Sequence, residues 1–240
     1  MKRRMVIALA AALACPTLAA AQERALPRQT GFAISPFLGY AFAYSQHGTV
    51  RFTDIQGGVY RATYNRRVDG GVMPGLALEY QPGRFGFSAA AAYNRRGEET
   101  LATDFADVLP LYSPGGSMWF FRGTLTIDLR EAEDDLRIAH PTARLSLGPA
   151  MVRDVPDTAT GRAPRNAFAV SGAASAELPL LKGLGLRGSF EDYVAFLPLA
   201  DVGVQLGENV SGQFGQPFAA DLRGGVAHLF VVRAALSYHF

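Results

Sequence analysis

The chain has 240 residues, with 23 basic and 21 acidic side chains, a formal net charge of +2 and a mean hydropathy of +0.09. Charges this nearly balanced exclude the strongly basic surface that nucleic-acid binding requires. The single cysteine, Cys15, excludes an intrachain disulfide and a thiolate metal cluster. The length fits one domain rather than several.

The first residues have the three parts of a secretory signal peptide. Lys2–Arg4 is a basic start, Met5–Leu13 is a short apolar run, and small residues end at Ala21. We therefore expect cleavage after Ala21, so that residues 1–21 are the signal and residues 22–240 are the mature domain. Cleavage removes three basic residues and no acidic residue, which leaves 20 basic against 21 acidic side chains.

The apolar run is too short to cross a bilayer as a helix. A lipoprotein signal that uses Cys15 fits poorly, because a leucine normally stands three residues before the lipidated cysteine and because Pro16 follows directly.

The mature sequence predicts an all-β fold with eight segments in which apolar and polar residues alternate. They are Phe32–Ser45, Val72–Gln81, Phe85–Asn94, Met118–Leu129, Ile138–Arg153, Asn166–Leu180, Leu184–Leu197 and Gly224–Phe240. Each is long enough for a tilted membrane strand, which needs about 9–11 residues. An open sheet leaves backbone groups unpaired in lipid, so we expect a closed, eight-stranded, antiparallel up-and-down transmembrane β-barrel.

The connections between these segments alternate in length along the chain. The long ones are Gln46–Gly71, Arg95–Ser117, Asp154–Arg165 and Pro198–Arg223, and the short ones are Pro82–Arg84, Arg130–Arg137 and Leu181–Gly183. Outer-membrane barrels alternate in this way, with short periplasmic turns and longer outer loops. An even number of strands then places both termini on the periplasmic side.

The polar faces of the segments predict the content of the barrel interior. Four acidic and four basic side chains share that face: Glu79, Arg122, Asp128, Arg144, Glu177, Arg187, Glu191 and Arg233. The interior of an eight-stranded barrel is only wide enough for side chains to fill it, so buried charges must pair. We therefore expect a packed, charged lumen, and the alternative is a narrow channel for small solutes whose ion pairs rearrange.

The last strand carries the features of a terminal sorting signal. From Val231 to Phe240 the residues alternate, and the chain stops on an aromatic side chain. Arg233, Ala235, Tyr238 and Phe240 occupy the polar, small, aromatic and final aromatic positions of the signal in bacterial outer-membrane barrels, with Ala where Gly is usual. The chain thus resembles small outer-membrane barrels of the OmpA/OmpX type. The resemblance implies Gram-negative outer-membrane localisation and insertion by the barrel assembly machinery.

The role that we expect is structural or surface-interacting, with four external loops and no catalytic activity. We expect no cofactor, no metal and no nucleic-acid partner, and the sequence does not identify a loop ligand. The loops carry mixed side chains, which include Tyr112, Asp104, Asp107, Asp154 and Asp157. The other hypotheses are a soluble periplasmic β-barrel or sandwich, and a lipid A-modifying enzyme that uses the nearby Ser237 and His239.

The motif Tyr-Asn-Arg-Arg occurs twice, at Tyr64–Arg67 and at Tyr93–Arg96. The second copy falls where the third strand should leave the membrane. Tyrosine is typical of the interfacial girdle, and arginine binds phosphate through its planar fork. Arg95 and Arg96 are therefore candidates for contact with lipopolysaccharide phosphates, although the same pattern also suits ordinary rim residues.

Some positions do not fit a regular barrel strand. Pro36 lacks the N–H that a strand ladder needs, and the alternation would direct Asp192 toward lipid unless a bulge or the outer rim lies there. The stretch Val59–Arg67 is itself strand-like and predicts a hairpin above the membrane. His228 should lie at the outer interface.

Overall fold

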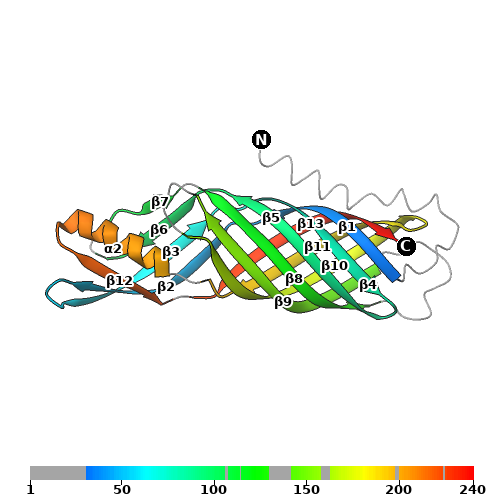
Figure 1. Cartoon of the computed structure of the whole chain (residues 1–240), viewed down its shortest axis with the longest axis horizontal. Helices are drawn as coiled ribbons and strands as arrows, with labels where there is room; N and C mark the ends of the chain where they lie inside the picture. Colours follow the sequence, from blue (N-terminus) through cyan, green and yellow to red (C-terminus); the bar gives the residue numbers. More distant parts are fainter. Residues whose placement is uncertain are drawn as a thin grey trace.

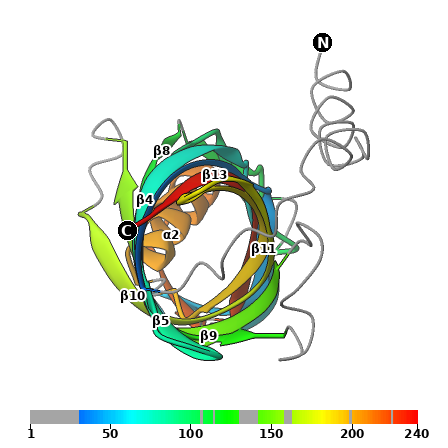
Figure 2. The same ribbon diagram turned by 90° about the vertical axis from the view of Figure 1, so that its right-hand side faces the viewer.

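The computed structural model describes residues 31–105, 108–113, 115–129, 142–157, 163–197, 200–223 and 225–240. Eight strands close into one antiparallel barrel, and a second sheet with a helix extends it at the end away from Phe240 (Figure 1). Viewed along the axis, the strands form a closed ring (Figure 2). The expected signal peptide lies outside the described residues. No described helix is long and apolar enough to cross a membrane.

The barrel strands correspond one to one with the eight predicted segments. They are β1 (Gly31–Ala41), β4 (Gly71–Gln81), β5 (Phe85–Arg96), β8 (Gly116–Asp128), β9 (Thr142–Pro156), β10 (Arg165–Leu181), β11 (Leu184–Ala195) and β13 (Ala227–His239). Their order around the barrel is β1-β13-β11-β10-β9-β8-β5-β4. The first and last strands close the ring, with Phe37 opposite Ala235. The predicted fold class is confirmed.

The exterior of the barrel is apolar. Large hydrophobic side chains on alternate positions face outward, and Phe87, Leu125 and Leu147 are 60%, 59% and 63% exposed. A soluble barrel would bury such side chains, because exposed apolar patches of this extent promote association in water. In a bilayer they form the lipid-facing belt of a barrel whose backbone groups are paired around the ring.

The first predicted loop is the hairpin that the sequence indicated. Strands β2 (Tyr44–Asp54) and β3 (Val59–Val68) pair antiparallel, with Val50 opposite Ala62. They belong to a five-stranded sheet of order β12-β2-β3-β6-β7, completed by β6 (Glu99–Thr103), β7 (Leu111–Ser113) and β12 (Phe218–Arg223). Residues from three predicted outer loops thus form one ordered sheet beyond the barrel (Figure 1).

The last long loop contains a helix, α2 (Ala200–Phe214), that the sequence analysis did not identify. We call the five-stranded sheet the outer sheet. The helix packs on its Val50 and Phe52 through a buried face formed by Val202, Leu206 and Val210. The Ser211 hydroxyl accepts a hydrogen bond from the N–H of Phe218 at 2.7 Å. The helix therefore covers strand β12 and buries a second apolar core, which we call the outer core.

Two glycines of α2, Gly203 and Gly207, allow the helix to lie directly on β12. A Cβ at Gly207 would come within 2.9 Å of the Phe218 carbonyl oxygen, whereas a Cβ at Gly212 on the same helix would meet nothing within 4 Å. We expect Gly207→Val to displace α2 at a cost of about 1–3 kcal/mol. Limited proteolysis of the refolded protein should then cleave the outer region faster, and the barrel itself should stay intact. Gly212→Val is the matched control, and equal cleavage rates of the two variants would contradict the packing argument.

The irregular positions are accommodated without a change of register. Pro36 faces outward on β1 opposite Leu76 of β4, and the pairing with β13 is interrupted only around it. No bulge interrupts the pairing of β11 at Asp192, which lies opposite Phe230 of β13. Instead the Asp192 carboxylate lies 2.9 Å from Nδ1 of His228, and both side chains are solvent-accessible near the outer end of the barrel.

Candidate functional site

The barrel interior near the chain terminus contains a cluster of ion pairs that we call the lower charge layer: Glu79, Arg122, Asp128, Arg144, Glu177, Arg187, Glu191, Arg233 and His239. Glu177 is its centre. Its Oε2 lies 3.1 Å from Nη1 of Arg144 and 3.0 Å from Nε of Arg187, and its Oε1 lies 2.7 Å from Nε2 of His239. Arg187 also pairs with Glu79. The two acids and two arginines therefore compensate one another in a site that water hardly reaches.

Glu191 organises the second half of the same layer. Its Oε1 lies 3.0 Å from Nη1 of Arg122 and also contacts Arg233. The hydroxyl of Tyr193 donates a hydrogen bond to Oε2 at 2.9 Å. Asp128 is buried and lies opposite Arg144 in the strand register. The structure thus places all eight lumen residues named from the sequence inside the barrel, and it adds His239 and Tyr193 as polar partners.

Little free space remains among these charges. A cavity of about 30 Å³ lies between the ion pairs and is lined by serines as well as by charged groups, among them Ser35, Ser88 and Ser146. One enclosed water needs roughly 10–15 Å³, so the cavity has room for about two waters.

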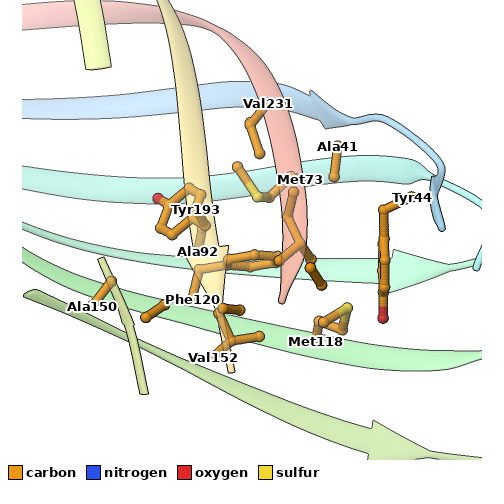
Figure 3. Packing of buried hydrophobic residues seen from close by; sticks show 14 of the residues in the cluster. Ala41, Tyr44, Met73, Ala92, Met118, Phe120, Ala150, Val152, Tyr193 and Val231 are labelled. Atoms are coloured by element: carbon orange, nitrogen blue, oxygen red, sulfur yellow. The ribbon is translucent and has the colours of Figure 1, made fainter. Parts of the chain in front are cut away.

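Above the lower charge layer the interior is apolar, which the sequence analysis did not expect. Met73, Phe120, Val152 and Val231 are at most 1% exposed and point toward one another inside the barrel (Figure 3). The Phe120 and Tyr193 rings are 5.1 Å apart between centroids. We call this cluster the apolar layer. The expected charged lumen is therefore interrupted by this apolar layer.

A second cluster of ion pairs, the junction charge layer, lies between the apolar layer and the outer core. It consists of Arg66, Arg96, Glu99, Asp154 and Arg165. Arg66 Nε and Arg96 Nη1 each lie 2.8 Å from a carboxylate oxygen of Glu99, and Arg165 Nη2 lies 2.7 Å from Asp154. Since these residues come from β3, β5, β6, β9 and β10, the layer joins the outer sheet to the barrel.

The junction charge layer corrects two predictions. Arg96 was a candidate for lipopolysaccharide contact, but its side chain is 1% exposed and pairs with Glu99 and Asp154, so no phosphate outside the barrel reaches it. Asp154 was placed in an external loop, but it lies in β9 and is buried. Arg95 does face outward and is exposed, so its contact with lipopolysaccharide stays a prediction.

Two carboxylates of the outer sheet accept hydrogen bonds within it: Asp54 in the β2–β3 turn and Asp104 from β3. Asp54 accepts backbone hydrogen bonds from Gly58 at 2.7 Å and from Gln56 at 2.9 Å, and these bonds hold the pKa of its carboxyl below the usual value. Asp104 accepts from the Thr63 backbone at 2.6 Å and from its hydroxyl at 2.9 Å, and its pKa is lowered for the same reason. Both stay ionised as structural acceptors. Asp107 lies outside the described residues.

Ser237 and His239, the pair considered for catalysis, both point into the barrel, where they are 0% and 8% exposed. The structure places the Glu177 carboxylate against His239. That carboxylate also binds two arginines, so the histidine is one of three side chains that Glu177 contacts. Among the described residues, no three His, Cys, Asp or Glu side chains are grouped as metal ligands.

Comparison with solved structures identifies the fold as that of small eight-stranded outer-membrane barrels. OprG from Pseudomonas aeruginosa is 12% identical with a TM-score of 0.58, over 89% of this chain and 98% of OprG. Neisserial surface protein A is 8% identical with a TM-score of 0.47, over 88% and 98% of the two chains. Ail of Yersinia pestis is 12% identical with a TM-score of 0.35, over 87% and 99%. No family model and no curated protein matches the sequence.

Proposed function

We propose that this outer-membrane β-barrel is a closed anchor in a structural or surface-interaction role. It holds at the cell surface the five-stranded outer sheet and α2, which we together call the outer domain. The observation that carries the proposal is the content of the lumen. Among the described residues, the cavity within the lower charge layer is about 30 Å³, and the apolar layer above it buries Met73, Phe120 and Val152 almost completely. An ion would have to cross both layers, and the side chains of Met73, Phe120 and Val152 offer it no polar ligand.

The outer domain supports the second half of the proposal. The junction charge layer and the outer core fix the sheet and α2 to the barrel, so this surface is held in one conformation. Binding to a preformed surface avoids the entropy cost of ordering a loop. Ser237 and His239 have no catalytic role in this proposal, because both side chains lie inside the barrel and Glu177 ties His239 to two arginines.

The test is the conductance of the refolded full chain in a planar bilayer, after a boiled-versus-unboiled gel shift has confirmed that it is folded. We expect silence, because neither layer offers a hydrated path. Reproducible current steps from verified folded protein would overturn the closed barrel and support the narrow channel.

Charge reversal at Arg122 distinguishes the two functions further. In a closed barrel Arg122→Glu places a second carboxylate beside Glu191, so we expect it to lower the stability of the protein and to produce no current. In a channel the same change would alter the ratio of cation to anion permeability. Arg84→Glu, at an exposed turn outside the lumen, is the control that changes the same charge without touching either layer.

A further inference from the structure

The outer boundary of the lipid-facing belt can be located on one side of the barrel. Tyr93, Trp119, Arg153 and Asn166 lie opposite one another on β5, β8, β9 and β10, and all face outward. We call these four residues the boundary row. One step toward the middle of the barrel, the outward residues are Phe121, Met151 and Phe168, which are apolar and exposed. Aromatic side chains mark the interfaces of membrane barrels, so Tyr93 and Trp119 indicate that lipid head groups begin near this row.

Two arginines lie at this boundary. Arg153 belongs to the boundary row, and Arg95 lies one step above it on β5, opposite Ser117. Both side chains are exposed. They are two strands and two residues apart, which corresponds to about 12 Å between their Cα atoms. Side chains as long as arginine can approach one anionic group from both sides at that separation, and a guanidinium binds phosphate oxygens in pairs.

Trp119 lies on β8, between the strands that carry the two arginines, and its side chain is partly exposed. Its ring is 40% exposed and packs edge-on against Tyr93, with the ring centroids 4.9 Å apart. A groove of about 520 Å³ opens above Arg95 and Ser117. Glu98 and Asp157 also line this groove, so an anion is repelled from the groove itself and must approach the arginines from the lipid-facing side.

The opposite wall of the barrel has different chemistry. There, on β11 and β13, the outward polar residues near the outer end are Asp192 and His228, which pair with each other. This pair presents no guanidinium to a phosphate. The two exposed guanidiniums are therefore concentrated on one side of the barrel, over β5, β8 and β9.

We propose that Arg95, Trp119 and Arg153 form a binding site for the phosphorylated sugar head group of an outer-leaflet glycolipid, with phosphate at the arginines and a sugar ring against Trp119. The two guanidiniums match the phosphates of such a head group, and the exposed ring of Trp119 matches its sugar. The proposal goes beyond the closed-anchor function and is independent of whether the lumen conducts, so failure of one does not decide the other.

Trp119 is the only tryptophan of the chain, so its emission reports directly on this site. The experiment titrates the full chain, refolded in detergent micelles, with bisphosphorylated lipid A and follows Trp119 fluorescence. We expect a saturable change. Arg95→Gln and Arg153→Gln should each weaken binding about tenfold, since each removes a charge-assisted contact. Lipid A without phosphates should bind more weakly to the unmodified protein.

Matched controls separate the site from general charge attraction. Arg84→Gln removes an exposed arginine from a turn at the other end of the barrel, and Arg61→Gln removes one from the outer sheet. Both should bind within twofold of the unmodified protein. Equal weakening by all four variants, or equal affinity for dephosphorylated lipid A, would overturn the proposal. Inorganic phosphate that competes as well as lipid A would identify free phosphate rather than lipid as the ligand, and would also overturn it.

Discussion

Glu177→Gln should lower the free energy of unfolding by about 3–5 kcal/mol, because the buried guanidiniums of Arg144 and Arg187 lose one of their counter-charges and then share Glu79. The Glu177 carboxylate contacts Arg144, Arg187 and His239, and all of these side chains are at most 10% exposed. Glutamine has nearly the same size, so the change removes the charge and leaves the packing. Urea unfolding of the protein in lipid vesicles, followed by Trp119 fluorescence and by gel shift, measures the effect.

Two further variants make the interpretation specific. Glu208→Gln removes an exposed carboxylate from α2 and should change stability by no more than about 0.5 kcal/mol. Adding Arg144→Met to Glu177→Gln removes one of the buried cations that lost the Glu177 counter-charge, so the double variant should recover part of the lost stability. If Glu177→Gln unfolds at the same urea concentration as the parent, the lower charge layer does not hold the barrel together in the way that we describe.

The eight barrel strands could be predicted because membrane insertion imposes a simple pattern on the sequence. Each strand must alternate between lipid and lumen, and each must be long enough to cross, so β5 was predicted as Phe85–Asn94 and observed as Phe85–Arg96. The same periodicity also predicts that Arg96 faces the barrel interior rather than the lipid. Asn94 faces inward on β5, and a residue two positions later on the same strand shares that face. The error was to end the strand at the expected membrane boundary, although β5 continues past it.

The apolar layer was missed because membrane barrels are expected to be polar inside. The inward positions of β8 include Met118 and Phe120 beside Arg122, so the signal was present but mixed with charges. Only the relative height of residues on neighbouring strands shows that the charges and the apolar side chains separate into layers. That height depends on strand register, which a single sequence does not determine.

Helix α2 was missed for a different reason. Val202, Leu206 and Val210 recur every four residues, which is the spacing of a helical face, but Gly203, Gly207 and Gly212 lower the intrinsic helix propensity of the same segment. Two of these glycines are where β12 approaches the helix backbone. The outer domain is thus stabilised by tertiary packing, which local sequence preferences do not reveal.

Deletion of Phe240 should reduce the amount of protein in the outer membrane of cells to a small fraction, with little effect on the folded barrel. In the structure Phe240 is 66% exposed, its N–H donates to the Phe32 carbonyl at 3.1 Å, and its ring stacks on Phe32 with centroids 6.5 Å apart. These contacts at the rim contribute only about 1 kcal/mol. We therefore propose that the terminal aromatic acts mainly during assembly, as part of the signal formed by Arg233, Ala235, Tyr238 and Phe240.

The deletion and Phe32→Ala together separate assembly from stability, because both remove the same ring contact and only the deletion changes the end of the chain. Purified and refolded in detergent, both variants should show the gel shift of a folded barrel. In cells, quantitative blotting of outer-membrane fractions should find Phe32→Ala near the parental level and the deletion far below it. A truncated chain that reaches the outer membrane at the normal level would disprove the assembly role. A matching loss for Phe32→Ala would assign the effect to the ring contact instead.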